Sequence, residues 1–237
     1  MIILGIDTAT DSVSVAVGEG KLILAHSEAV SDRQHCEALT PMIDFVCKQA
    51  GVSFREIGAV AVDIGPGLFT GLRVGIASAK AIAHSLDLPI IGISSLDVLA
   101  ATTSPTESVI VSVIDARRSE IYWAMYRRID DELRQVLAPC VGSVSDFVIS
   151  VLERAQSAYF IGNGALRYRD EIIEGISTAI QGCEFADEVL SRPTAATLVA
   201  LAHERAVNEL WQTAQQVSPL YLRAPDAVIN WSTRSAS

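Results

Sequence analysis

The loop after the first apolar run carries side chains suited to holding a metal-bound phosphate. Residues 2–7 (IILGID) end in Asp7, and Thr8 and Thr10 follow directly. A carboxylate beside two hydroxyls can hold a divalent cation or a phosphate oxygen. No glycine lies between Asp7 and Asp11, so close approach of the backbone to a phosphate is harder. The alternative is a polar turn in which these side chains satisfy turn amides.

Two further loops have some features of anion-binding turns. Gly162 and Gly164 flank Asn163 between an apolar run and a helical pattern, where free backbone N–H groups can contact a nucleotide. The stretch 115–118 (DARR) lacks glycine, and its arginines suit contact with a partner. The alternatives are a plain strand-to-helix turn and a charged hairpin turn. No Gly-Lys-Ser/Thr is present, so the sequence contains no Walker loop. We therefore expect no cofactor in the isolated chain.

Two predicted helices have surfaces suited to a protein partner. In 70–85 the small residues Gly71, Gly75 and Ala79 recur every fourth position, and Arg73 lies one turn into the helix. Small residues let helices approach closely, and Arg73 can pair with an acidic residue of a partner.

The second candidate surface is a stripe on the helix predicted over 33–50. It is displaced from the core positions of that helix and consists of His35, Ala38, Met42 and Phe45. Exposed Met and Phe favour an interface. The alternative is a helix buried on two sides within the monomer.

The elements that position these residues follow the order meander, helix, strand, helix, strand once, and the meander-helix-strand opening of that order recurs in the second half. Period-two patterns and turn residues predict strands, and 3.6-residue patterns predict helices. In the first half we expect strands 2–7, 12–17, 21–28, 58–64 and 89–93, with helices 33–50, 70–85 and 95–102; Thr70 is the expected N-cap of the second helix. In the second half we expect strands 109–114, 120–127, 132–138 and 158–161, helices 144–156 and 194–213, and a closing strand or docked tail at 219–223.

This repeated order predicts an α/β, duplicated ribonuclease-H-like fold of the actin-like ATPase kind, with mixed sheets flanked by helices. A single Rossmann domain would open with a strand-helix-strand unit instead of hairpins. We expect one domain at 1–105, completed by the C-terminal segment 194–223, and a smaller domain at 106–193.

Composition excludes several classes of protein. Half of the 237 residues are apolar and 19% are charged, which indicates a packed core. The net charge of −10 disfavours autonomous RNA binding. The four cysteines form no CxxC pair and suit buried thiols in a reducing cytosol. No signal peptide and no apolar run of about 18 residues is present, so we expect a cytoplasmic protein without a membrane span.

The segment 63–83 (DIGPGLFTGLRVGIASAKAIA) resembles the hallmark of the TsaB (YeaZ) family. Segments 3–17, 34–43, 113–126 and 219–223 resemble other parts of that family in the same order. The resemblance implies a non-catalytic subunit that pairs with the transferase TsaD through the two helices above, and that works with the ATPase TsaE. The implied product is N6-threonylcarbamoyladenosine at position 37 of ANN-decoding tRNAs.

The resemblance also sets expectations about ligands and partners. ATP or ADP would bind at an interface with partners, tRNA would be met only through the complex, and two copies of the chain would pair when TsaD is absent. TsaD-type enzymes hold a metal with two histidines four residues apart. In this chain the residue four positions after His35 is Leu39, whose side chain cannot be a metal ligand. We expect no metal site and no catalytic residue. The alternatives are an autonomous actin-fold ATPase or kinase, and a glycoprotease-like metallopeptidase.

Overall fold

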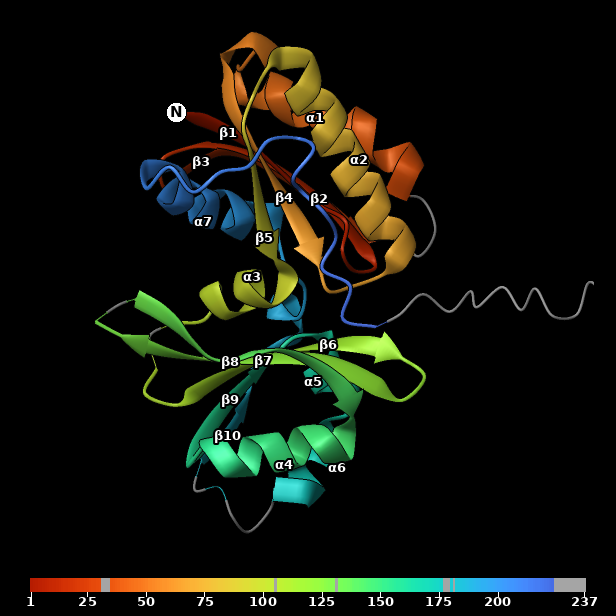
Figure 1. Cartoon of the computed structure of the whole chain (residues 1–237), viewed down its shortest axis with the longest axis vertical. Coiled ribbons are helices and arrows are strands. Elements are labelled where there is room, and N and C mark those ends of the chain that lie inside the picture. Colours follow the sequence, from red (N-terminus) through yellow and green to blue (C-terminus); the bar gives the residue numbers. More distant parts are fainter. Residues whose placement is uncertain (31–34, 105, 131, 177–179, 181, 224–237) are drawn as a thin grey trace, which may run out of the picture.

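Two five-stranded sheets, one from each half of the chain, form the framework of the protein (Figure 1). The computed structural model describes residues 1–30, 35–104, 106–130, 132–176, 180 and 182–223; the side chains of His35 and Cys36 lie outside this description. The first sheet consists of β1 (Ile2–Asp7), β2 (Ser12–Glu19), β3 (Leu22–Val30), β4 (Ile57–Gly65) and β5 (Ile90–Ser94). The second consists of β6 (Val109–Arg117), β7 (Glu120–Ile129), β8 (Glu132–Ser143), β9 (Ser157–Ile161) and β10 (Gly182–Phe185).

Both sheets have the same topology. The strand orders are β3-β2-β1-β4-β5 and β8-β7-β6-β9-β10, so each sheet runs third, second, first, fourth, fifth in chain order. In each, the first three strands form an antiparallel meander and the last two add in parallel. The prediction of a duplicated ribonuclease-H-like fold is confirmed.

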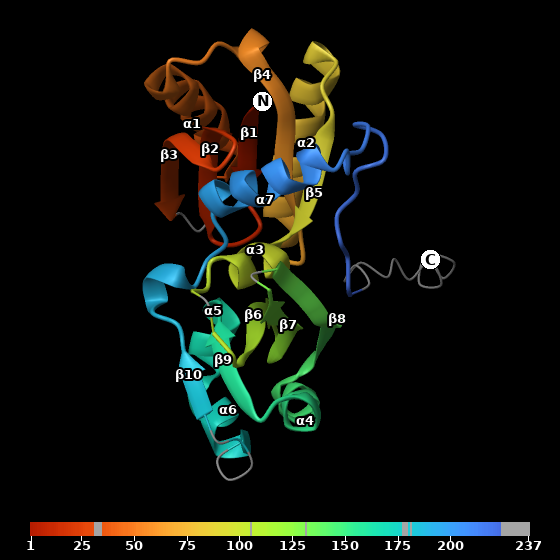
Figure 2. The ribbon, with the colours of Figure 1, turned by 90° about the vertical axis from the view of Figure 1, so that its left-hand side faces the viewer.

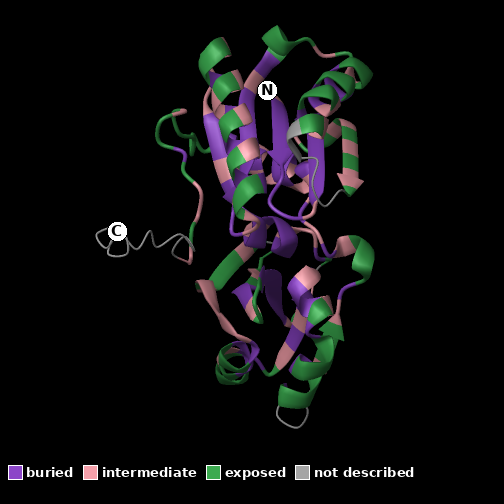
Figure 3. Cartoon of the chain, turned by 90° about the vertical axis from the view of Figure 1, so that its right-hand side faces the viewer, coloured by how far each residue is buried: buried purple, intermediate pink, exposed green. Residues whose placement is uncertain are grey.

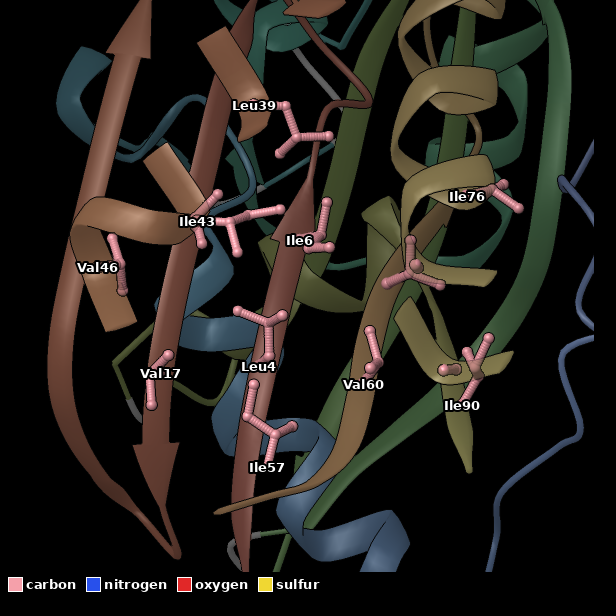
Figure 4. Packing of buried hydrophobic residues seen from close by; sticks show 14 of the residues in the cluster. Leu4, Ile6, Val17, Leu39, Ile43, Val46, Ile57, Val60, Ile76 and Ile90 are labelled. Atoms are coloured by element: carbon pink, nitrogen blue, oxygen red, sulfur yellow. The ribbon is translucent and has the colours of Figure 1, made fainter. Parts of the chain in front are cut away.

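Helices cover both faces of the first sheet. The helices α1 (His35–Ala50) and α2 (Phe69–Leu86) lie side by side on one face, and α7 (Ala195–Val207) crosses the other (Figures 1 and 2). On the first face, Leu39 and Ile43 from α1 and Ile76 from α2 pack with Leu4 and Ile6 of β1 (Figure 4). Because these side chains are fully desolvated, this layer stabilises the first lobe strongly.

The second lobe is joined to the first through a short helix. The helix α3 (Ser95–Ala101) packs between α7 and the second sheet, and all of its leucines are buried. On the outer face of the second sheet lie α4 (Val144–Arg154), α5 (Asn163–Arg167) and α6 (Arg169–Ile176). Two short 3₁₀ turns, Phe54–Glu56 and Glu188–Leu190, complete the described elements.

Several element predictions differ from the structure. The helix expected over 194–213 ends at Val207, residues 219–223 form no strand, and α5, α6 and β10 were not predicted. Thr70 is not the N-cap of α2, because Leu68 holds that position and Thr70 lies inside the first turn. The expected domain boundary at residue 105 falls on a residue outside the described ranges, and so stays a prediction.

The end of α7 has a specific physical cause. The Glu209 N–H donates to the Ala206 carbonyl at 3.0 Å, and the Leu210 N–H donates to the Arg205 carbonyl at 2.9 Å. Glu209 adopts a left-handed conformation with φ of 57°. This is the Schellman arrangement that closes many helices, but glutamate occupies the position where glycine is usual. The sequence therefore lacks the glycine that usually marks such an end, and its signals are the weaker ones of Asn208 at the C-cap and Arg205 in the last turn.

Cysteines and membrane propensity can be compared with the sequence directly. Cys47 is a buried free thiol, but Cys183 is a free thiol exposed on β10, so the expectation of buried thiols is wrong for it. No helix among the described residues is both long and apolar enough to cross a membrane.

Candidate functional site

The apolar surface predicted on α1 is accessible at Phe45, whereas Met42 also packs against the core of its own lobe. Phe45 is 52% exposed, and Ala38 and Met42 are half-buried. The core positions Leu39 and Ile43 of the same helix are buried against the sheet. His35 begins α1, but its side chain lies outside the description. Figure 3 shows exposed stretches on the outer sides of the helices of the first lobe.

The small-residue face of α2, in contrast, is not available to a partner. Gly71, Gly75 and Ala79 are buried. The Thr8 hydroxyl donates to the Gly71 carbonyl at 2.7 Å, and a Cβ on Gly75 would collide with Thr8 Oγ1. The small side chains let α2 close onto β1 of its own sheet, so their assignment to a partner surface is wrong. Arg73 lies elsewhere on α2 and is exposed.

A cavity of about 220 Å³ lies between the two lobes. The first lobe contributes Thr10 and Asp11 from the β1–β2 turn, and the second contributes Asp115, Asn163 and Arg167 from the end of β6 and from α5. The cavity wall therefore combines carboxylates, a guanidinium and an amide from segments far apart in the sequence.

Of the residues predicted to contact a nucleotide, the structure brings one to this cavity. Thr10 lines it, whereas Asp7 and Thr8 are each 1% exposed and Gly162 and Gly164 lie off the wall. Gly162 has φ of 116°, and a Cβ there would collide with the Val113 carbonyl. The two glycines thus serve close packing against β6, which accounts for them without a ligand.

The backbone amides of the cavity loops are already used within the chain. The Ala9 N–H donates to Asp7 Oδ1 at 2.9 Å, and the Leu68 N–H donates to the Ala9 carbonyl at 2.7 Å. In the second lobe the Asp115 N–H donates to Asn163 Oδ1 at 3.0 Å. The Arg117 N–H donates to Asp115 Oδ1 at 2.9 Å. These loops therefore match the alternative of self-satisfied polar turns.

Two ion pairs that the sequence did not indicate frame the cavity. Arg192 donates to Asp11 through Nε at 2.8 Å and through Nη2 at 3.2 Å, and these hydrogen bonds lower the pKa of Asp11. Arg167 Nη1 donates to Asp115 Oδ2 at 3.1 Å. The members of the first pair are 181 residues apart, so only the closed duplicated fold brings them together.

A pair of buried carboxylates lies beneath the β1–β2 turn. Asp7 ends β1, Asp63 lies two residues before the end of the neighbouring parallel strand β4, and each is 1% exposed. Burial raises the pKa of Asp63 to about 7 and, with the nearby Asp63 charge, raises the pKa of Asp7 well above its usual range. The hydroxyl of Ser95 donates to Asp63 Oδ1 at 2.6 Å. Asp63 was not predicted as a site residue, although an aspartate near the end of a buried strand is a visible signal.

The second oxygens of these carboxyl groups have no partner beyond the pair itself. Within the described ranges, no other group bonds Asp7 Oδ2 or Asp63 Oδ2, and the two side chains share a hydrogen bond when one of them is protonated. The same part of the chain contains no group of three or more histidine, cysteine or acidic side chains placed to hold a metal ion.

Two sheets of one strand order, meeting at an interlobe cavity, define a protein of the duplicated ribonuclease-H-like, actin-like class. The family model described as "TsaD: tRNA N6-adenosine threonylcarbamoyltransferase" matches residues 23–231. An uncharacterized protein of Mycobacterium leprae is 35% identical over 230 residues, which cover 95% of this chain and 56% of that protein.

Named relatives agree with this match. The tRNA threonylcarbamoyladenosine biosynthesis protein TsaB of Escherichia coli is 40% identical over 130 residues, covering 54% of this chain and 56% of that protein. The solved structure of YeaZ from Pseudomonas aeruginosa superposes with a TM-score of 0.78 at 26% identity, over 93% of this chain and all of the other. The chain belongs to the family that this model describes, and within that family to the TsaB (YeaZ) group.

Proposed function

We propose that this chain is a non-catalytic accessory subunit in the formation of N6-threonylcarbamoyladenosine at position 37 of ANN-decoding tRNAs. In this role it pairs with a TsaD-type transferase and works with a TsaE-type ATPase. The names of its TsaB relatives support the pathway. The transferase would perform the chemistry, in the cytoplasm, and tRNA would meet this acidic chain only within the complex.

The observation that carries the proposal is the exposed apolar surface of α1. Phe45 is more than half exposed, although the helix already buries a complete second stripe against its own sheet. An exposed phenylalanine beside a half-buried methionine costs solvation free energy in a lone monomer and is typical of interfaces. The same surface would pair two copies of the chain when the transferase is absent.

The interlobe cavity supports the non-catalytic part of the proposal. Its volume, about 220 Å³, is below the range of about 300–1,000 Å³ that is typical of ligand pockets. Its loop amides bond within the chain, and the Asp7 carboxylate is buried away from the wall. ATP or ADP would accordingly bind at an interface with partner proteins.

A charge placed on α1 tests the pairing. Phe45→Asp should weaken binding to the cognate TsaD-type protein by at least about tenfold, measured by calorimetry and by light scattering, because a carboxylate would be buried in an apolar contact. Thr40→Asp, an equal charge change at another exposed position of α1, is the matched control. Normal pairing of Phe45→Asp would show that α1 is not the interface.

The non-catalytic role has its own test. The purified chain should not hydrolyse ATP by itself. Turnover by the chain alone within the ordinary enzyme range, about 1–10³ s⁻¹, would contradict the assignment.

A further inference from the structure

A cluster of two aromatic rings and a guanidinium lies at the first turn of α2. The Arg73 Cζ atom is 3.8 Å from the centroid of the Phe69 ring. The Phe69 and Tyr221 rings stack with centroids 5.5 Å apart and an interplanar angle of 30°. Arg73 Nε donates to the Tyr221 hydroxyl at 3.2 Å. The guanidinium plane is thus fixed from one side by Phe69 and at one nitrogen by Tyr221.

The rest of the Arg73 guanidinium is unused. Among the described residues, neither Nη1 nor Nη2 of Arg73 has a hydrogen-bond partner. The side chain is exposed, and Phe69 and Tyr221 are 44% and 43% exposed. Arg167, Arg192 and Arg223 each pair with a carboxylate of the chain itself. Arg73 has no such pair among the described residues, a feature that it shares with Arg169, which lies over the Phe185 ring.

The C-terminal segment holds this cluster from both sides. Val217 is buried in the core of the first lobe, and the Leu220 N–H donates to the Ile64 carbonyl at 2.7 Å. Two residues after Tyr221, Arg223 Nη1 donates to Glu120 Oε2 of the second lobe at 2.7 Å. Figure 2 shows this segment running from the end of α7 past β5 to the second lobe. Tyr221 is therefore fixed between anchors on both lobes.

We propose that Arg73 is a preformed binding site for an aspartate or glutamate side chain of the protein that docks on α1, with Phe69 and Tyr221 as positioning residues. The inference rests on the proposed function, and it names a recognition contact of that interface. A guanidinium whose plane is held in advance loses little side-chain entropy on binding and offers a two-pronged hydrogen bond to a carboxylate.

The surroundings favour a protein carboxylate over a nucleic-acid phosphate. Phenylalanine, tyrosine and arginine together are the composition enriched in protein interfaces. The chain's net charge of −10 opposes approach of a polyanion. The cluster lies on the side of α2 that faces the C-terminal segment and β5, whereas α1 packs on β2 and β3 (Figure 2). Because α1 and α2 lie side by side, a partner that covers both helices would reach it.

The test is calorimetric titration of the full chain with its cognate TsaD-type protein, at low and at high salt. Arg73→Gln should weaken pairing about tenfold and reduce its salt dependence, since one charged contact is lost. Arg73→Lys should recover only part of the affinity, because an ammonium cannot form the fork. Tyr221→Phe keeps the stacked ring and removes one hydrogen bond, so its loss should be smaller. Arg55→Gln, which removes the same charge at an exposed site in the same lobe, is the matched control.

The outcomes separate this inference from the proposed function. If Arg73→Gln pairs like the wild type while Phe45→Asp does not, the carboxylate site is wrong and the interface stands. If both variants pair normally, α1 is not the interface and the carboxylate site is wrong, whereas a wild-type chain that does not pair with the TsaD-type protein would contradict the proposed function. Equal losses in Arg73→Gln and Arg55→Gln would reduce the effect to general charge, and a change confined to binding of a tRNA transcript would assign the site to phosphate. Either result would overturn the proposal. Unchanged melting temperatures are required of all four arginine and tyrosine variants.

Discussion

At the scale of single residues, the buried pair Asp7 and Asp63 has a consequence for stability. Both carboxyl groups lie under the β1–β2 turn, and among the described residues the second oxygen of each has no hydrogen-bond partner other than the neighbouring carboxyl group. Removing a charged carboxylate from water is costly, so burial favours the protonated forms. The folded protein thus binds protons that the unfolded chain releases.

The sign of the resulting pH dependence follows from the raised pKa values. Asp63 has a pKa of 3.8 in the unfolded chain and of about 7 in the folded protein. Its protonated form therefore contributes its full stabilisation below pH 3.8, and this contribution is lost as the pH rises through about 7. Relative to Asp63→Asn, the wild type should therefore lose unfolding free energy between these limits, by at most about 1.4 kcal/mol per pH unit for this group. Denaturant titrations of both proteins at a series of pH values measure the difference.

An exposed carboxylate provides a control of opposite sign. Hydrogen bonds from Ser143 lower the pKa of Asp146 at the start of α4, so its contribution is present above the unfolded pKa and is lost as the pH falls. Asp146→Asn should therefore differ from the wild type mainly at neutral pH. If the Asp63→Asn difference also grew toward neutral pH in the wild type's favour, the buried-pair account would be wrong.

At the scale of elements, α2 shows how one sequence pattern can have two meanings. The four-residue spacing of Gly71, Gly75 and Ala79 indicates close packing of a helix face, and the structure confirms close packing. The pattern does not show which element packs against this face. In the structure it is β1 of the same chain and not a partner protein. On α1, by contrast, the stripe with Phe45 could be predicted, because the same helix already has a full core stripe.

Substitution on the buried face of α2 should therefore damage folding. Ala79 is 0% exposed, so Ala79→Arg would bury a charge without a partner and should lower the free energy of unfolding by more than about 3 kcal/mol. Urea unfolding followed by circular dichroism measures this loss. Lys80→Arg, at the next position of α2, should leave the free energy of unfolding nearly unchanged. A soluble, fully stable Ala79→Arg protein would show that α2 is not packed on the sheet as described.

The end of α7 offers a stabilising change. Glu209 adopts the left-handed conformation, with φ of 57°, which favours glycine. Glu209→Gly should raise the unfolding free energy by about 1 kcal/mol, since it removes a steric cost of that size. Glu204→Gly, at an exposed position inside α7, should lower it by about 1 kcal/mol. Thermal unfolding of the two variants measures these changes. Melting temperatures that shift in the same direction for both variants would contradict the assigned end of α7.

At the scale of the whole molecule, the repeated order of elements was enough to predict the fold. Alternating apolar runs and the turn at Gly18–Gly20 identify the first meander, and the second meander follows the same pattern. The interlobe cavity could not be predicted in this way. Its ion pairs join Asp11 to Arg192 and Asp115 to Arg167, and no local pattern links residues that meet only after both lobes close.

The pair Asp11–Arg192 should couple the β1–β2 turn to the connection that returns from the second lobe. A double-mutant cycle with Asp11→Ala and Arg192→Ala should give a coupling free energy of about 1 kcal/mol, because both side chains are only partly exposed and the hydrogen bonds are two-pronged. Equilibrium unfolding of the four proteins provides the measurement. Strictly additive losses would show that the pair contributes nothing.

The return of α7 to the first sheet also determines the order in which the chain matures during synthesis. Its residues Leu198 and Val199 cover Ile3 and Ala61, which lie in the first third of the sequence. During synthesis, all helices of the second lobe have been made once residue 176 is reached. One apolar face of the first sheet stays uncovered until α7 is complete at residue 207. A nascent chain stopped near residue 190 should therefore expose its N-terminal half to proteases and chaperones, and release of the last fifty residues should end that exposure.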